Sequence, residues 1–277
     1  MKLLAQKMMH RRLATRFIYW LTRVRVPFMK NWMIGKFIRE YKVEMDDYVV
    51  RDAFSHPTFN SFFVRAIRPE CRPFPADERV IGSPADGTIF DFGTIRRDQR
   101  FQVKRFEYHL PELLNHRSPW SRTFEGGEYA IIYLAPANYH RIHMPVTGTL
   151  MDEHYIPGDF FSVNARTVHH IPHVFARNER LLTVFDTPFG KMALILVGAL
   201  FVAGIETVWR HSYQDVRKGV KTDFPDITLE RGQEMGRFNM GSTVILLFEP
   251  GRIRWGDISS DQQIRMGQPI AQASEGD

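Results

Sequence analysis

Residues 180–209 read RLLTVFDTPFGKMALILVGALFVAGIETVW, and this stretch decides the fold. Short apolar runs rich in Leu, Val, Ile and Phe alternate with turn residues, as β-strands and their connections do. The longest run, residues 192–205, has 14 residues, is closed by Lys191 and Glu206, and is interrupted by glycine. A helix that spans a bilayer needs about 20 apolar residues. The stretch therefore predicts buried strands that turn at glycine.

The same alternation extends in both directions from this stretch and predicts a mainly antiparallel β body. A short helical interruption is expected at 110–114, and helices and loops at 43–75. With helices at the front, the fold class is α+β. We expect two parts, residues 1–42 and a catalytic domain over 43–277. The further β segments are 79–95, 128–151 and 241–251.

The first 42 residues are basic and aromatic. Apolar residues recur there at helical spacing, Pro27 ends a first helix, and a second runs from Phe28 to Tyr41. Eleven Lys or Arg and one acid, Glu40, give this segment a charge of +10. Amphipathic helices of this composition are typical of segments that lie in an anionic membrane interface. A basic helical pair packed on the body, or an organelle transit peptide, would have a similar pattern.

Composition excludes several classes of protein. The chain has 277 residues, 44% of them hydrophobic, which is enough for a proper core. Its one cysteine, Cys71, excludes internal disulfides and multi-cysteine metal sites. The net charge is +6, so the chain beyond residue 42 carries −4 and has no basic surplus for a nucleic-acid backbone.

Three polar positions stand out against the β pattern. Asp86 lies in the turn SPADGTI (83–89), where an Asp usually caps its own turn. His140 and His143 lie in YHRIHMPVTG (139–148), where buried histidines are often only satisfied core groups. Gly241-Ser242 opens an apolar run and has two interpretations. It is either a polar strand start or a reactive peptide bond. The second is open because glycine permits a strained backbone, and because Ser together with Asp and His can transfer acyl groups.

A zinc site is the alternative for the histidines. His140 and His143 could join the cluster HHIPH (169–173), but the spacings match no strong zinc signature. A zinc-dependent hydrolase would bind metal and lose activity with a chelator. A second alternative is a non-enzymatic, membrane-associated β-domain, which would stay one intact chain.

Five ordered blocks between about residues 55 and 270 resemble the phosphatidylserine decarboxylases of the bacterial and mitochondrial type. The Gly-Ser-Thr of 241–243 is the most specific part. Two departures are Met240, where the family usually has Leu or another apolar residue, and Arg105, where Gly is common. The blocks are SPADGTI (83–89), YHRIHMPVTG (139–148), FSVNARTVHHIPHVFARNERL (161–181), GALFVAGIETVW (198–209) and MGRFNMGSTVILLFEPG (235–251).

The resemblance implies that the chain cuts itself between Gly241 and Ser242. The Ser242 hydroxyl attacks the Gly241 carbonyl, and elimination and hydrolysis leave a covalent pyruvoyl group (the pyruvate cofactor) at residue 242. His143 is expected to be the base, with Asp86 holding its tautomer, and His140 the acid that returns a proton to the substrate. The products are a β chain (1–241) and an α chain (242–277).

The resemblance also implies the partners. The pyruvoyl ketone forms a Schiff base with the amine of phosphatidylserine and accepts electrons as CO2 leaves, giving phosphatidylethanolamine. We expect a zymogen of phospholipid biosynthesis that acts as a homodimer of cleaved chains, with no metal and no nucleic-acid partner. Its place would be the cytoplasmic face of the bacterial inner membrane, as a peripheral protein, rather than the mitochondrial inner membrane.

Overall fold

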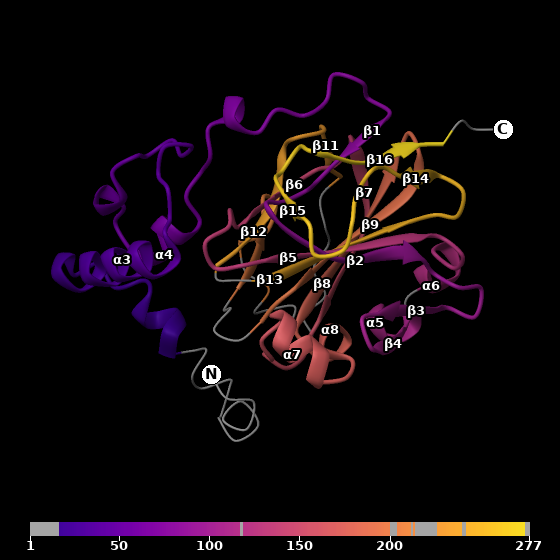
Figure 1. Ribbon diagram of the computed structural model, residues 1–277, viewed down its shortest axis with the longest axis horizontal. Helices are drawn as coiled ribbons and strands as arrows, with labels where there is room; N and C mark the ends of the chain where they lie inside the picture. Colours follow the sequence, from indigo (N-terminus) through magenta and orange to yellow (C-terminus); the bar gives the residue numbers. More distant parts are fainter. Residues whose placement is uncertain are drawn as a thin grey trace.

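An eight-stranded antiparallel sheet forms the centre of the molecule (Figure 1). Every pairing between named strands of the described chain is antiparallel, which agrees with the predicted α+β class. The computed structural model describes residues 17–116, 119–199, 204–211, 213, 226–239 and 242–274, with only the backbone of Ser242. In order across the sheet, the strands are β11 (Thr228–Leu229), β7 (Gly148–Ile156), β8 (Arg180–Thr187), β9 (Gly190–Val197), β13 (Ser242–Phe248), β5 (Glu128–Leu134), β2 (Gly87–Thr94) and β15 (Gln263–Ile264).

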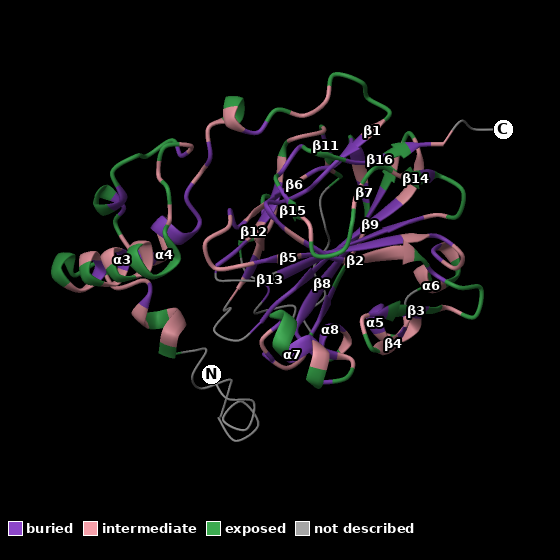
Figure 2. Cartoon of the chain, viewed as in Figure 1, coloured by how far each residue is buried: buried purple, intermediate pink, exposed green. Residues whose placement is uncertain are grey.

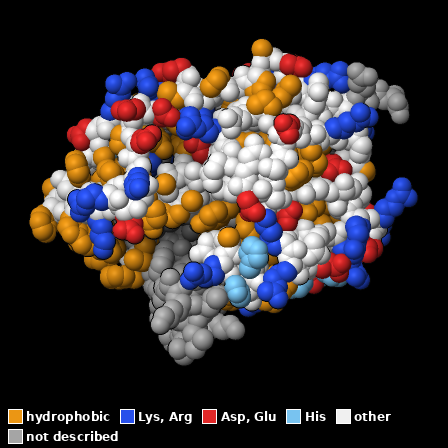
Figure 3. All heavy atoms as spheres, viewed as in Figure 1, with side chains coloured by type: hydrophobic (Ala, Val, Ile, Leu, Met, Phe, Trp, Pro, Cys, Tyr) orange, Lys and Arg blue, Asp and Glu red, His pale blue; other side chains and the backbone are white. Residues whose placement is uncertain are grey.

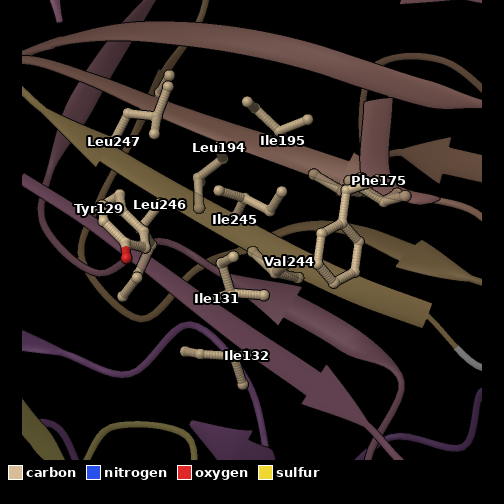
Figure 4. Close-up of a cluster of buried hydrophobic side chains, with 14 of the residues drawn as sticks. Tyr129, Ile131, Ile132, Phe175, Leu194, Ile195, Val244, Ile245, Leu246 and Leu247 are labelled. Atoms are coloured by element: carbon tan, nitrogen blue, oxygen red, sulfur yellow. The ribbon is translucent and has the colours of Figure 1, made fainter. Parts of the chain in front are cut away.

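The middle of this sheet is buried on both faces (Figure 2). The side chains of residues 244–247 on β13 are fully buried, and Figure 4 shows them among those of β5 and β9. A strand covered on both faces is a continuous apolar run rather than an alternating one. Phe175 of α8 (Val174–Arg177) packs into the same core, next to α7 (Ala165–His170). The buried strand predicted at the start of 192–205 is therefore confirmed as part of β9.

Three smaller sheets and, besides α7 and α8, two further short helices of the described chain lie around the large sheet. The sheet β10-β12-β6 matters most for the site, because β12 leads along the chain toward β13. The helix predicted at 110–114 is confirmed as α5. The elements are β1 (Val80–Gly82), β16 (Pro269–Ala273) and β14 (Ile253–Trp255); β10 (Ile205–Thr207), β12 (Glu234–Phe238) and β6 (Arg141–His143); β3 (Arg100–Val103) and β4 (Phe106–His109); and α5 (Leu110–Leu113) and α6 (Trp120–Thr123).

The front of the chain forms a helical layer beside one end of the sheet (Figure 1). Residues 17–21 are helical, and the part of the predicted first helix before residue 17 lies outside the described residues. The helix ends at residue 21 rather than at Pro27, because residues 22–26 form a turn and an extended link to α3. The predicted second helix is α3, which begins at Pro27, because proline suits the first helical position. Ile34 of α3 packs with Phe62 of α4 in a second, smaller core. The layer comprises α3 (Pro27–Tyr41), η1 (Ala53–Ser55), α4 (Phe59–Phe63) and η2 (Pro69–Cys71).

No helix within the described ranges has the length and apolar character to cross a bilayer.

Candidate active site

Ser242 is the first residue of β13 and pairs with Leu134, the last residue of β5. The strand start predicted at this position is therefore confirmed. Met240, Gly241 and the side chain of Ser242 lie outside what the structure describes. Self-cleavage between residues 241 and 242 thus stays a prediction, while the backbone of Ser242 fixes where that bond must lie.

Asp86 lies at the same end of the sheet. It directly precedes β2, and the pairing of Thr88 with Tyr133 brings the start of β2 beside the end of β5. Strand β5 lies between β2 and β13. Because neighbouring strands are about 4.8 Å apart, the backbone at the start of β2 lies about 10 Å from that of Ser242.

The two candidate histidines flank this end of the sheet. The backbone N–H of His143 donates to the carbonyl of Pro84 over 2.9 Å, which ties β6 to the Asp86 turn. The N–H of Phe238 donates to the carbonyl of His140 over 3.0 Å, at the end of β12. The fold therefore gathers Asp86, His140, His143 and Ser242 in one region.

The carboxylate of Asp86 is buried and paired with Arg72. Arg72 donates from Nε to Oδ1 over 2.9 Å and from Nη2 to Oδ2 over 2.8 Å, and the Met266 N–H donates to Oδ1 over 2.8 Å. Burial alone would lower the pKa of Arg72, but its hydrogen bonds to Asp86 and Asp47 raise that pKa above the ordinary value. The carboxylate therefore does not cap its own turn, as an isolated Asp in that turn would.

The expected hydrogen bond between Asp86 and His143 is not made, and this part of the prediction is corrected. His143 Nδ1 lies 2.7 Å from the carbonyl oxygen of Gly232, and Nε2 lies 3.0 Å from the hydroxyl of Tyr139. A carbonyl can only accept, so Nδ1–H is the donor and the neutral ring keeps its lone pair on Nε2. The carbonyl of Gly232 thus sets the tautomer of His143. Both oxygens of Asp86 instead accept hydrogen bonds from Arg72.

Both histidines are held neutral. Burial lowers the pKa of His143, while the hydrogen bond to Gly232 and the charges of Glu234 and Asp86 oppose that change. Burial also lowers the pKa of the fully enclosed His140, to about 3. A neutral imidazole keeps a lone pair on one nitrogen, and the smaller opposition to a proton at His143 makes it the better base of the two.

His140 differs from His143 in having one unsatisfied ring nitrogen. Its Nδ1 donates to the carbonyl of Asn138 over 2.7 Å, so Nε2 carries the lone pair. This Nε2 is buried without a hydrogen-bond partner, and the ring centroid lies 4.2 Å from that of Phe63. Buried polar atoms in native proteins normally have a partner. An unpartnered acceptor beside a candidate reaction centre is what a proton-transfer role requires.

Three neighbours of the site were missed from the sequence. Arg72 lies in a proline-rich connector, Tyr139 was read only as part of a motif, and Thr243 was read as strand. Thr243 is fully buried, and its hydroxyl has no hydrogen-bond partner. A threonine in an apolar run is the one signal that could have drawn attention to this position.

The second histidine cluster belongs to a different structural element. His169 and His170 lie on α7, and each places Nδ1 near a carbonyl of its own helix, at 2.6 and 2.7 Å. His173 Nδ1 lies 3.4 Å from Glu112. Among the described side chains, no group of three or more His, Cys, Asp or Glu could hold a metal ion.

Comparison with known proteins identifies the family. The family model described as Phosphatidylserine decarboxylase matches residues 59–272, and one described as PSD matches residues 1–42. The chain belongs to the phosphatidylserine decarboxylase family, and it is a decarboxylase.

Relatives named phosphatidylserine decarboxylase proenzyme are similar over nearly the whole chain. The one from Bordetella avium (strain 197N) is 46% identical over 274 residues, covering 97% of this chain and 93% of the relative. Those from Saccharophagus degradans and Azotobacter vinelandii are 42% and 40% identical, covering 93% and 98% of this chain and 92% and 98% of the relatives.

Proposed function

We propose that the chain decarboxylates phosphatidylserine to phosphatidylethanolamine, using a pyruvoyl group made from its own Ser242 after self-cleavage at Gly241-Ser242. The observation that carries this proposal is the position of Ser242. It opens a central strand at the one end of the sheet where two neutral histidines and a buried Asp-Arg pair lie.

Self-cleavage needs a base for a weak nucleophile. The hydroxyl of Ser242 loses its proton as it attacks the carbonyl carbon of Gly241, and the amide becomes an ester. We assign the base to His143, because its backbone is tied to the Asp86 turn and the charges of Glu234 and Asp86 favour the imidazolium that forms, against burial and the charge of Arg141. Elimination then frees the 1–241 chain, and hydrolysis of the dehydroalanine releases ammonia and leaves the ketone.

The cleaved chains would stay together because of where the cut falls. Strand β13 begins the α chain (242–277) and is hydrogen-bonded to β5 on one side and β9 on the other, both from the β chain. Its residues 244–247 are fully buried. Separation would expose this strand, so the two chains form one folded unit. The homodimer stays a prediction.

The buried surroundings of residue 242 fit a pyruvoyl group. The unpartnered His140 Nε2 and Thr243 hydroxyl are polar atoms that such a group, or the substrate joined to it, could engage. When present, the group supplies an electrophile for the substrate amine and an electron sink as CO2 departs.

We assign the proton transfers during decarboxylation to His140. The carbanion left when CO2 departs needs a proton, and the unpartnered His140 Nε2 is the atom that would carry it. Burial and, to a smaller extent, the charge of Arg65 lower the pKa of His140, so a proton on this ring is given up readily to the α-carbon. The ring takes up its next proton from water.

The helical layer would bring the site to the membrane. Six of the large hydrophobic side chains exposed in the described chain lie in residues 17–41, and Figure 3 shows hydrophobic side chains beside Lys and Arg on this part of the surface. We infer peripheral binding to anionic lipid at the cytoplasmic face of the inner membrane. The six are Phe17, Trp20, Val26, Phe28, Trp32 and Tyr41.

Replacing Phe28 and Trp32 with Ser is expected to weaken binding to anionic vesicles by at least tenfold, because burying one such side chain contributes about 1.5–3 kcal/mol. Phe28 is 84% and Trp32 57% exposed, so the fold should tolerate both changes. Vesicle co-sedimentation measures the effect. Met151→Ser is the matched control, since Met151 is 44% exposed on β7, outside this layer. Equal binding by the double variant and this control would refute the interface.

The intact mass of the purified protein tests the proposed function directly. We expect two chains, the smaller beginning at residue 242 with a pyruvoyl group in place of serine, and release of CO2 from phosphatidylserine. Ser242→Ala should give one uncut chain without activity. A single uncut wild-type chain, or activity that survives Ser242→Ala, would overturn the proposal.

A further inference from the structure

Arg65 is a buried cation with no acidic partner among the residues that the structure describes. It follows α4 and is 2% exposed. It donates from Nη1 to the carbonyl of Phe62 over 3.2 Å and from Nη2 to the hydroxyl of Tyr48 over 2.9 Å. Its Nε has no hydrogen-bond partner. The guanidinium carbon also lies 4.0 Å from the ring centroid of Tyr48.

This environment sets Arg65 apart from other buried arginines of the described chain. Arg72 pairs with Asp86 and Asp47, and Arg180 donates four hydrogen bonds to carbonyls. Burial lowers the pKa of Arg65, and only Tyr48 opposes that change. Guanidinium nonetheless stays charged in proteins. A buried charge costs several kcal/mol unless it is paired, so a charge kept in this state indicates an anion that is bound during function.

Arg65 lies beside the candidate acid-base residue His140. The ring of Phe63 packs against His140 with centroids 4.2 Å apart, and the carbonyl of Val64 accepts a hydrogen bond from Arg141, the residue after His140. The charge of Arg65 also acts on the pKa of His140. The segment that ends in Arg65 is therefore packed against the segment of His140, and each segment has a buried nitrogen without a partner, Nε of Arg65 and Nε2 of His140.

The helical layer connects this pair both to the exposed aromatic residues and to the cleavage segment. Phe37 of α3 contacts Phe62 and Phe63 of α4 edge to face. Asn60 of α4 donates to the carbonyl of Asn239, three residues before Ser242. The segment that ends in Arg65 thus lies between the exposed aromatic residues of α3 and the chain that leads to Ser242.

We propose that Arg65 binds the phosphodiester of the phosphatidylserine headgroup, an assignment that rests on the proposed function. The headgroup has two anions, a carboxylate and a phosphodiester. The carboxylate loses its charge as CO2 forms, so a guanidinium bound to it would stabilise the ground state and oppose the reaction. The phosphodiester keeps its charge throughout, so pairing with it strengthens binding of substrate and product alike.

The product separates the two anions experimentally, because phosphatidylethanolamine retains the phosphodiester and lacks the carboxylate. For Arg65→Met we expect two constants, both measured in mixed micelles, to rise together: the KM for phosphatidylserine and the inhibition constant of phosphatidylethanolamine. The expected rise is about 10- to 100-fold, which is the usual effect of losing a charge-assisted hydrogen bond. The assignment rests on these two constants, because loss of the Arg65 charge also acts on the pKa of His140 and so on kcat. Arg65→Lys should restore part of both constants, since it keeps the charge and loses the planar donor pair.

Two further measurements keep the assignment falsifiable. Tyr48→Phe removes the phenol that Arg65 contacts but leaves the guanidinium, so KM should stay near wild type. Self-cleavage, followed by intact mass, reports whether each variant folds. A raised KM with an unchanged inhibition constant would assign Arg65 to the carboxylate, and no change in either would make the residue structural; both outcomes overturn the proposal. A wild-type protein that does not decarboxylate would instead defeat the proposed function.

Discussion

His143→Gln is expected to slow self-cleavage by about 10²- to 10⁴-fold, the usual contribution of general acid-base catalysis. His140→Gln should cleave at the normal rate, and its rate of decarboxylation should fall by a similar factor. The two rings differ in their electrostatic surroundings. Burial lowers the pKa of both rings; at His143 the charges of Glu234 and Asp86 oppose it and that of Arg141 adds to it, whereas at His140 the one nearby charge, Arg65, adds to it. His143 is therefore suited to keep the proton that Ser242 gives up, and His140 to release one.

The two reactions can be followed separately in one preparation. Intact mass against time after synthesis gives the cleavage rate, and CO2 release by the fully cleaved protein gives the decarboxylation rate. Thermal melting of each variant shows whether a loss reflects misfolding, since both rings are enclosed. Tyr139→Phe is a useful comparison, because it removes the hydroxyl at His143 Nε2 and leaves the His140 contacts unchanged. The assignment fails if His140→Gln blocks cleavage or if His143→Gln cleaves at the normal rate.

The central strands could be predicted from the sequence because a strand that is buried on both faces consists of consecutive apolar residues. Residues 244–247 are an unbroken apolar run, and the structure places them between two other strands. Proline and glycine likewise marked element boundaries, as Pro27 does for α3. Each of these features depends only on residues that are close together in the sequence, so a local sequence pattern is enough to predict it.

The partners of the polar side chains could not be predicted in this way. Asp86 and Arg72 are 14 residues apart, and His143 and Gly232 are 89 apart. Nothing in either local pattern encodes these contacts, because each depends on how separate strands pack. The sequence thus indicated polar residues that the fold gathers at one end of the sheet, while the expected Asp86–His143 bond was replaced by bonds of His143 to Gly232 and of Asp86 to Arg72. Arg65 was not predicted for the same reason. Whether an arginine has an acidic partner is determined by the folded structure and not by its neighbours in the sequence.

Arg72→Met is expected to reduce the free energy of unfolding by about 3–5 kcal/mol, the usual cost of removing one partner from a buried ion pair. The change leaves Asp86 buried, with only the Met266 N–H to bond it. Urea denaturation measures the loss, carried out in the Ser242→Ala background so that one uncut chain unfolds. Arg96→Met is the matched control, since Arg96 pairs with Asp98 and Glu107 at an exposed site, and it should change stability little.

A second substitution shows whether the unpaired charge is the cause. Adding Asp86→Asn to Arg72→Met removes the buried charge and retains an amide oxygen that can accept from the Met266 N–H, so stability should partly recover. If Arg72→Met is as mild as the Arg96 control, the carboxylate finds water or another donor, and the pair does not anchor the turn. If the double variant is no more stable than Arg72→Met, the loss comes from the packing of the arginine stem and its contact with Asp47. Recovery would instead mean that Arg72 stabilises the buried charge of Asp86. The Asp86 carboxylate would then lie near enough to favour an imidazolium at His143 without a hydrogen bond to that ring.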